Sequence, residues 1–152
     1  MKLGIAADHG GFTLKEEIKA WLREAGHEVI DFGAFTLEPA DDYPDFVAPL
    51  GEAIVAGSVE RGIAVCGSGV GASIAANKIP GIQAALIHDS FSARQGVEDD
   101  DMNLICLGGR VLGNKMAQEL ISGFLKARYI GGGRYQRRLD KVKALEDKYR
   151  NK

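Results

Sequence analysis

Short apolar runs alternate along the chain with longer stretches in which apolar residues recur at helical spacing. Five of the apolar runs have the length and composition of strands that are buried on both faces of a parallel sheet. They are Leu3–Ala7, Glu28–Phe32, Gly62–Cys66, Gln83–Ile87 and Asn103–Leu107. Strands that alternate with helices along a chain are typical of a doubly wound α/β fold.

Helical patterns fill the intervals between these strands. In the first interval, one stripe carries Leu14, Ile18, Trp21, Leu22 and Ala25. Further helices are predicted over Asp45–Ala56, Gly71–Lys78, Ser90–Val97 and Asn114–Ala127, and a highly charged one over about Arg134–Arg150. The pattern therefore predicts a Rossmann-like doubly wound five-stranded parallel sheet with an extra C-terminal helix. It indicates one domain over residues 1–152, with about 131–152 as a helical extension.

The expected strand order is 2-1-3-4-5, and in such sheets ligands bind outside the carboxyl ends of the strands, where the order reverses. That point lies between the first and third strands. The first strand leads into Asp8 and His9, and the third ends at Cys66, which a glycine-rich segment follows. The two stretches with the most reactive side chains are thus predicted to meet at one cleft.

Composition narrows the classes of function. The net charge of -2 gives no reason to expect nucleic acid or an acidic membrane as a partner, and no apolar run approaches the ~18 residues of a membrane span. Two cysteines, Cys66 and Cys106, do not form a disulfide framework, so a reducing, cytoplasmic setting is expected. The three histidines and two cysteines show no metal-ligand spacing, and no metal or other cofactor is predicted.

The segment after the third strand reads CGSGVG and permits two interpretations. Gly67, Gly69 and Gly71 would let backbone N–H groups approach an anion, with Cys66 as a base or nucleophile beside it. Alternatively, the glycines form a tight turn next to a buried, inert thiol. The position of Cys66 at a strand end favours the first interpretation, whereas Cys106, inside a strand, fits an inert role.

Other candidates also follow strand ends or share a helix face. Asp8 and His9 could bind substrate hydroxyls or phosphate, or Asp8 could cap a helix. The pair His88 and Asp89, after the fourth strand, permits the same two interpretations. The cationic candidates for an anion site are Arg110, which follows the fifth strand, and Arg134 and Arg138, four residues apart on the charged helix.

Five stretches of the chain resemble the type B ribose-5-phosphate isomerase family, which includes the subunits of galactose-6-phosphate isomerase. They are AADHGGFTLKEEI, DDYPDF, CGSGVGASIAANKIPGI, NLICLGGRVLG and GGGRYQRRL. The matches occur in family order over almost the whole chain. The resemblance implies a metal-free aldose–ketose isomerase that acts through an enediolate. It also implies a homodimer or a dimer of dimers, in which the C-terminal arginines reach the neighbouring subunit's site.

The resemblance also implies roles for individual residues. Cys66 would be the base that moves a proton between C1 and C2, with Ser68 close to that proton. The backbone of Gly67, Gly69, Val70 and Gly71 would hold the enediolate oxygen. The remaining substrate-binding positions would be Asp8 and His9, together with Arg110, Arg134 and Arg138 as the phosphate grip.

One segment departs from the family pattern. The family reads Arg-Glu-His-Asn-Asn before the fifth strand, where the His opens the sugar ring, but this chain has VEDDDMN, with Asp99 at the His position and Asp100 at the Asn position. Asp99 could act as the acid or base, His88 could replace it, or the run could be a solvated surface. A four-carbon ketose phosphate would need no ring opening at all.

The sequence therefore favours an isomerase of phosphorylated sugars, with ribose 5-phosphate and ribulose 5-phosphate as the expected pair. The alternatives are an isomerase of allose 6-phosphate, galactose 6-phosphate or a tetrose phosphate. A non-catalytic sugar-phosphate-binding subunit of a hetero-oligomer is a further alternative, against which the intact Cys66 argues.

Overall fold

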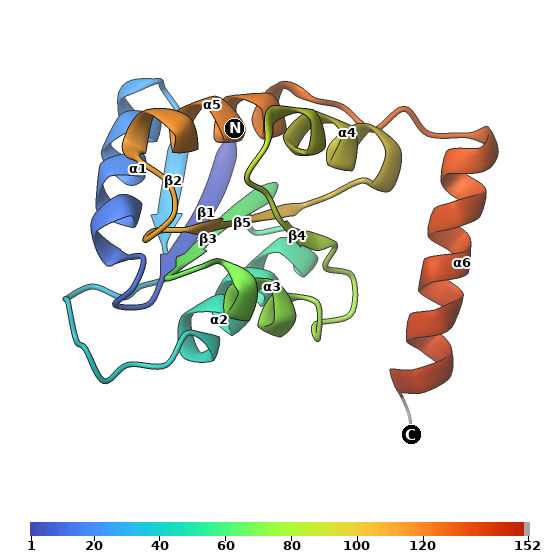
Figure 1. Cartoon of the computed structure of the whole chain (residues 1–152). Coiled ribbons are helices and arrows are strands. Elements are labelled where there is room, and N and C mark those ends of the chain that lie inside the picture. Colours follow the sequence, from blue (N-terminus) through green and yellow to red (C-terminus); the bar gives the residue numbers. More distant parts are fainter. Residues whose placement is uncertain (151–152) are drawn as a thin grey trace.

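The computed structural model describes residues 1–150 and contains a five-stranded, all-parallel sheet with helices on both faces (Figure 1). The strands are β1 (Lys2–Ala7), β2 (Glu28–Asp31), β3 (Arg61–Cys66), β4 (Ala84–Leu86) and β5 (Leu104–Gly108). The helices are α1 (Phe12–Glu24), α2 (Pro44–Val55), α3 (Val70–Ala76), α4 (Ser90–Asp100), α5 (Asn114–Lys126) and α6 (Gly133–Arg150). Every predicted strand and helix is present. Residues 151–152 of the predicted extension lie outside the described part of the chain.

The strands lie in the order β2-β1-β3-β5-β4, so the expected order 2-1-3-4-5 is wrong at one edge of the sheet. All residues of β5 are buried, whereas β4 has three residues, of which Leu86 is exposed. A short, partly exposed strand suits an edge position, and the fully apolar β5 suits the interior. The adjacency of β1 and β3 is as predicted, with Ala7 paired with Val65, so the predicted position of the cleft is unchanged.

Two apolar clusters hold the layers together. On one face of the sheet, α1, α4 and α5 pack through residues such as Ile18, Leu120 and Phe124. On the other face, α2 and α3 pack through residues such as Leu50 and Ala72. Burying each such leucine, isoleucine or phenylalanine contributes about 1.5–3 kcal/mol, so the sheet is a rigid platform for its strand ends.

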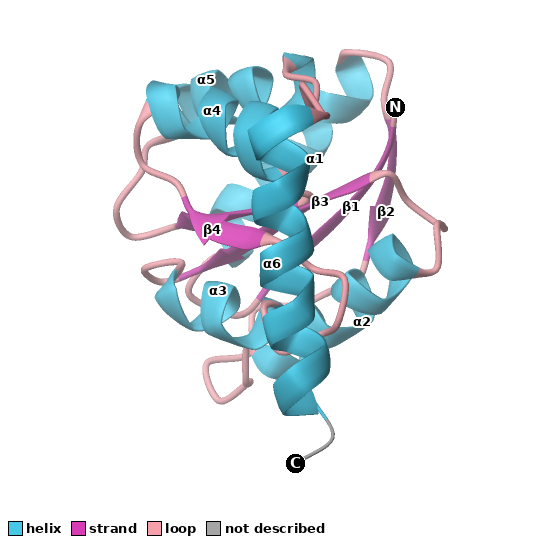
Figure 2. Ribbon diagram, turned by 90° about the vertical axis from the view of Figure 1, so that its right-hand side faces the viewer, coloured by secondary structure: helices cyan, strands magenta, loops and turns pink. Residues whose placement is uncertain are grey.

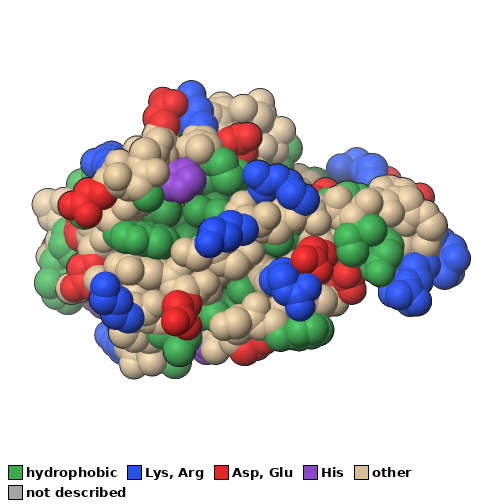
Figure 3. All heavy atoms as spheres, turned by 90° about the horizontal axis from the view of Figure 1, so that it is seen from above, with side chains coloured by type: hydrophobic (Ala, Val, Ile, Leu, Met, Phe, Trp, Pro, Cys, Tyr) green, Lys and Arg blue, Asp and Glu red, His purple; other side chains and the backbone are tan. Residues whose placement is uncertain are grey.

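Helix α6 stands beside the β4 edge and buries none of its residues (Figure 2). Two grooves of about 490 and 590 Å³ lie between it and the body of the protein. On the groove side, Val142 and Leu145 stay 52% and 57% exposed. Seen from above, α6 projects from the body with basic, acidic and hydrophobic side chains on its surface (Figure 3). No described helix combines the length and the apolar character needed to cross a membrane.

Candidate active site

A pocket of about 380 Å³ opens at the carboxyl ends of β1, β3 and β5. Its lining consists of Asp8, Tyr43, Cys66, Gly67, Ser68, Gly71, Arg110 and Val111. Backbone hydrogen bonds tie two of the strand ends together: the Gly109 N–H donates to the Cys66 carbonyl at 2.7 Å and the Arg110 N–H to the Gly67 carbonyl at 3.0 Å. The structure therefore brings together the strand-end residues that the sequence predicted to meet.

The Cys66 thiol lies at the mouth of the glycine loop. Its Sγ accepts a hydrogen bond from the Gly69 N–H at 3.1 Å, and the residue is 5% exposed. Gly69 has a φ of +84°, and a Cβ at this position would lie 2.9 Å from the Leu107 carbonyl carbon, so a side chain here would be strained and crowded. The loop thus holds the sulfur at the pocket with the Gly69 N–H beside it, and a glycine loop at this position is suited to a developing oxyanion.

Cys106 differs from Cys66 in both position and environment. It lies inside β5 and is fully buried. Burial raises the pKa of its thiol, and the nearby Cys66 adds to that effect. Such a thiol does not ionise at neutral pH, which agrees with the inert role predicted for Cys106.

Asp8 shapes the turn after β1 instead of capping a helix. Its Oδ1 accepts hydrogen bonds from the Gly10 and Gly11 N–H groups at 2.9 and 3.2 Å, and α1, which begins at Phe12, has no side-chain cap. A Cβ on Gly10 would lie 2.8 Å from the Gly67 amide nitrogen, so the turn after β1 and the glycine loop after β3 nearly touch. The capping alternative for Asp8 is therefore wrong, and the residue lines the pocket.

Sequence reasoning missed two residues of the site, both on the loop between β2 and α2. The Oδ1 of Asp41 accepts hydrogen bonds from the His9 N–H at 2.9 Å and from His9 Nδ1 at 2.7 Å. The ring of Tyr43 lies over Gly71, where a Cβ would be 2.8 Å from it. Their signal in the sequence is positional: this long loop leaves β2 at the same edge of the sheet as the pocket.

Among the described residues, one group is compact enough to hold a metal ion. Asp8, His9 and Asp41 each offer a ligand atom within 4.8 Å of the others. In the structure, however, His9 Nδ1 and Asp41 Oδ1 are hydrogen-bonded to each other. The arrangement is therefore that of an Asp–His pair beside a second carboxylate.

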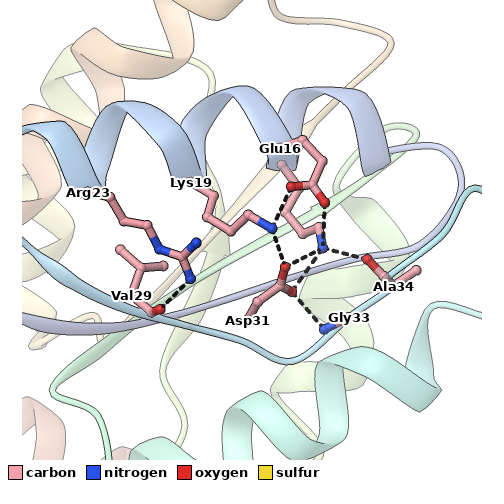
Figure 4. Close-up of polar contacts among 8 residues, drawn as sticks. Glu16, Lys19, Arg23, Val29, Asp31, Gly33 and Ala34 are labelled. Carbon is pink, nitrogen blue, oxygen red and sulfur yellow. Dashed lines mark hydrogen bonds and ion pairs between the residues drawn. The ribbon is translucent and has the colours of Figure 1, made fainter.

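A buried ion cluster anchors the start of the same loop (Figure 4). Lys15, which is fully buried, donates to both carboxylate oxygens of Asp31 at 2.9 Å and to the Ala34 carbonyl at 2.5 Å. The Gly33 N–H also donates to Asp31, at 2.8 Å. The Gly33 carbonyl and the Ala34 N–H in turn pair with Ala7, the residue before Asp8. The cluster thus fixes both the loop and the end of β1.

The electrostatics of this cluster favour an ionised Asp31. Burial alone would raise the pKa of the Asp31 carboxyl. Hydrogen bonds from Lys15, Lys19 and the Gly33 amide outweigh burial, and the net effect lowers the pKa. Lys19 donates to Asp31 at 2.8 Å, so the carboxylate binds two ammonium groups.

The remaining predicted site residues lie at the opposite end of the sheet. The Asp100 carbonyl accepts a hydrogen bond from Gln83 Nε2 at 2.8 Å, which places it beside the amino end of β4. Asp99, in the last turn of α4, accepts one from Gln95 Nε2 at 2.8 Å. A strand such as β5 spans about 13 Å at 3.3 Å per residue, so a comparable distance separates these aspartates from Cys66.

The arginines of α6 accompany these aspartates. Arg134 donates to the Tyr135 hydroxyl at 3.5 Å; this contact and the charge of Asp99 raise the pKa of the Arg134 guanidinium. Arg138 is one turn further along the same exposed helix.

The predicted site residues thus form two separate groups. The carboxyl-end group consists of Asp8, His9, Cys66, Ser68 and Arg110. The arm group consists of Asp99, Asp100, Arg134 and Arg138.

His88 belongs to neither group. It follows β4 and does not line the pocket, although its Nε2 is buried without a hydrogen-bond partner among the described residues. The neighbouring Asp89 caps α4 by accepting the Ser92 N–H at 2.7 Å. Asp89 therefore has a structural role.

A thiol, a glycine loop and an arginine at the carboxyl end of a doubly wound sheet are the parts of an enzyme that transfers a proton on an anionic substrate. Comparison with known proteins agrees, since the sequence model of the Ribose/Galactose Isomerase family matches residues 3–142. The chain belongs to this family and is an aldose–ketose isomerase.

Relatives of known name span nearly the whole chain. Ribose-5-phosphate isomerase B of Escherichia coli is 41% identical over 147 residues, which cover 97% of each chain. D-erythrulose-4-phosphate isomerase of Pectobacterium atrosepticum is 38% identical over 133 residues, or 88% of each chain. The solved structure of ribose-5-phosphate isomerase B from Clostridium thermocellum has a TM-score of 0.94 and 47% identity, and the match covers 98% of this chain and 99% of that one.

Proposed function

We propose that the protein interconverts ribose 5-phosphate and ribulose 5-phosphate, with Cys66 as the base. The observation that carries the proposal is the nearly buried Cys66, whose sulfur accepts a hydrogen bond from the Gly69 amide in a pocket that Arg110 also lines. The names of the Escherichia coli and Clostridium thermocellum relatives support this substrate.

The proposed reaction is a proton transfer between two carbons. The Cys66 thiolate removes the proton from C2 of the open-chain aldose, and the electron pair moves into an enediolate whose oxygen faces the N–H groups of the glycine loop. A proton then moves from the C2 hydroxyl to the C1 oxygen, and Cys66 returns its proton to C1, which gives the ketose with no atom or electron gained or lost. Ser68, whose hydroxyl lines the same pocket, would hold the substrate hydroxyl next to the reacting carbons.

A second copy of the chain would complete the site. The carboxyl-end group and the arm group lie at opposite ends of one sheet, so one chain cannot place Arg134 and Arg138 at its own pocket. The grooves between α6 and the body of the protein and the exposed Val142 and Leu145 support burial of this helix against a partner. In a homodimer or a dimer of dimers, the arm group of one subunit would reach the carboxyl-end group of the other.

A tetrose phosphate is a second candidate substrate, and one observation favours it. The arm group has carboxylates at positions 99 and 100, and Asp99 already accepts a hydrogen bond from Gln95. The histidine that opens the sugar ring in the family pattern is thus absent from this position. A four-carbon ketose phosphate has no free hydroxyl that could close a furanose ring, and one relative is named for such a substrate.

Solvent deuterium uptake would test the proposal. The protein is incubated in D₂O with ribose 5-phosphate and, separately, with D-erythrulose 4-phosphate, beside a Cys66→Ala control. Deuterium at the carbon next to the carbonyl of ribulose 5-phosphate, absent in the control, is the expected result. Uptake into the tetrose alone, together with a gain on ribose 5-phosphate from Asp99→His, would establish the second candidate. Uptake into neither sugar would overturn both.

The two free cysteines also support a location in the reducing cytoplasm, because Cys66 would act as a thiolate. This location belongs to the same proposal.

A further inference from the structure

The contact between Asp41 and His9 joins two separate segments of the chain at the edge of the pocket. Both hydrogen bonds that His9 makes, from its backbone N–H and from Nδ1, go to the same oxygen, Asp41 Oδ1. The Asp41 side chain is 10% exposed and that of His9 is 31% exposed. The two bonds together fix the position of the imidazole ring, and the ring's contact with Asp41 is through Nδ1.

The surroundings of His9 also determine its charge. The largest effect is the hydrogen bond with Asp41, which raises the pKa of the imidazole; the charges of Asp8 and Asp41 raise it further. Burial and the charge of Arg110 act in the opposite direction. The net effect raises the pKa of His9. His9 therefore remains an imidazolium to a higher pH than an ordinary histidine. The other oxygen of Asp41, Oδ2, is buried without a donor among the described residues, so this carboxylate depends on His9 for its counter-charge.

His9 and Arg110 are two positive charges close to the pocket, and His9 directly follows Asp8, which lines it. Arg110 lines the pocket, and the two cations lie close enough to repel each other. An anion held between them would remove that repulsion and form charge-assisted hydrogen bonds with both. The neighbouring Asp8 accepts hydrogen bonds from the Gly10 and Gly11 amides, whereas the ring of His9 is hydrogen-bonded to Asp41.

We propose that Asp41 is a positioning residue, which holds the His9 ring in one orientation and in its protonated form so that His9 and Arg110 together bind the phosphate of the substrate. The proposal deepens the proposed function, on which its reference to a sugar phosphate rests. Asp41 does not touch the substrate; its whole effect passes through His9. The carboxyl-end group would thus have a phosphate affinity that falls when His9 loses its proton.

The test compares Asp41→Asn with Asp42→Asn, the same change at the next residue, whose side chain is exposed. The pH titration of the His9 ring is followed by NMR without ligand, with the three histidines assigned from His27→Gln and His88→Gln variants. The dissociation constant of inorganic phosphate is measured by calorimetry between pH 5.5 and 8.5. Steady-state kinetics with ribose 5-phosphate give kcat and KM over the same range.

In Asp41→Asn we expect the His9 titration midpoint to move to lower pH. At pH 8, phosphate affinity should fall about tenfold, as for one lost charge-assisted contact, and KM should rise similarly with kcat nearly unchanged. Below pH 6 the variant and the wild type should converge, because His9 is protonated in both. Asp42→Asn should follow the wild type at every pH. In a His9→Gln background, Asp41→Asn should have no further effect on phosphate affinity.

An unchanged His9 midpoint, or an equal loss of affinity at all pH values, would overturn the proposal. So would a further loss in the His9→Gln background, because Asp41 would then act through the shape of the loop. The titration and the phosphate affinity do not depend on turnover. If both followed Asp41 while no sugar phosphate was isomerised, the proposed function would fail and the role of Asp41 would stand.

Discussion

The carboxyl-end group and the arm group carry comparable chemistry but are held in place very differently. In the carboxyl-end group, Asp8 and Cys66 are nearly buried and each accepts backbone hydrogen bonds. In the arm group, Arg134 and Arg138 lie on a helix that buries none of its residues. The first group is pre-organised by the fold of one chain, whereas in the proposed dimer the arginines of the second would gain a fixed geometry only against the partner subunit. Substitutions in the two groups should therefore have different effects on turnover, binding and stability.

The largest expected effect is that of Cys66→Ala. Removing the base should lower kcat by at least about a thousandfold, within the range for acid–base catalysis, and leave the fold intact. Coupled isomerase assays and circular dichroism would measure the two properties. Cys106→Ala is the matched control in the neighbouring strand. It should keep the activity and lose about 1 kcal/mol of stability, since it deletes a buried sulfur. Equal activity loss in both variants would contradict the assignment of the base.

The second prediction concerns the ion cluster under the carboxyl-end group. Because the pKa of Asp31 is lowered on folding, its stabilisation is complete above the unfolded value of about 3.9 and is lost as the pH falls through the folded value. Asp31→Asn should cost about 3 kcal/mol at pH 7, because it removes the nearer counter-ion of the fully buried Lys15 and leaves only Glu16, at 3.7 Å. Urea unfolding from pH 7 to pH 2 should show less acid destabilisation in the variant. A parallel pH dependence would disprove the role of Asp31.

The sequence predicted the carboxyl-end group well because its members follow strands directly. The end of an apolar run determines where a strand ends. Neighbouring parallel strands then bring Asp8, Cys66 and Arg110 to one edge of the sheet, independently of the conformation of the loops. The order of β4 and β5 was wrong because it depends on which strand is better buried, a property of packing. The role of Asp41 was not predicted, because it arises from the fold of a long loop whose sequence has no helical or strand periodicity. The sequence alone does not place Asp99 and Arg134 relative to the pocket, because in the proposed dimer they would act at the pocket of the partner subunit.

The third prediction tests whether the two groups meet between subunits. The double variant Arg134→Ala, Arg138→Ala should raise KM about thirtyfold, because it loses charge-assisted contacts with the phosphate. Its free energy of unfolding should not change, because both side chains are exposed. Mixing this variant with Cys66→Ala by joint refolding should restore activity. Random pairing in a two-fold dimer leaves about a quarter of the sites with both groups intact. If the mixture, assayed at low substrate concentration, were no more active than the mean of its two parent variants, the sharing of sites would be refuted.

The smallest expected effect is that of Tyr43→Phe, which removes one hydroxyl from the pocket and keeps the ring over Gly71. One hydrogen bond to an uncharged substrate hydroxyl contributes about 1 kcal/mol, so KM should rise about fivefold and stability should hardly change. Tyr43→Leu should cost more, because the ring that covers the glycine loop is then lost. Steady-state kinetics of both variants measure the difference. If Tyr43→Phe had the KM of the wild type while Tyr43→Leu was impaired, the predicted hydrogen bond of the hydroxyl would be refuted. The Tyr43 ring would then shape the carboxyl-end group without a polar contact to the substrate.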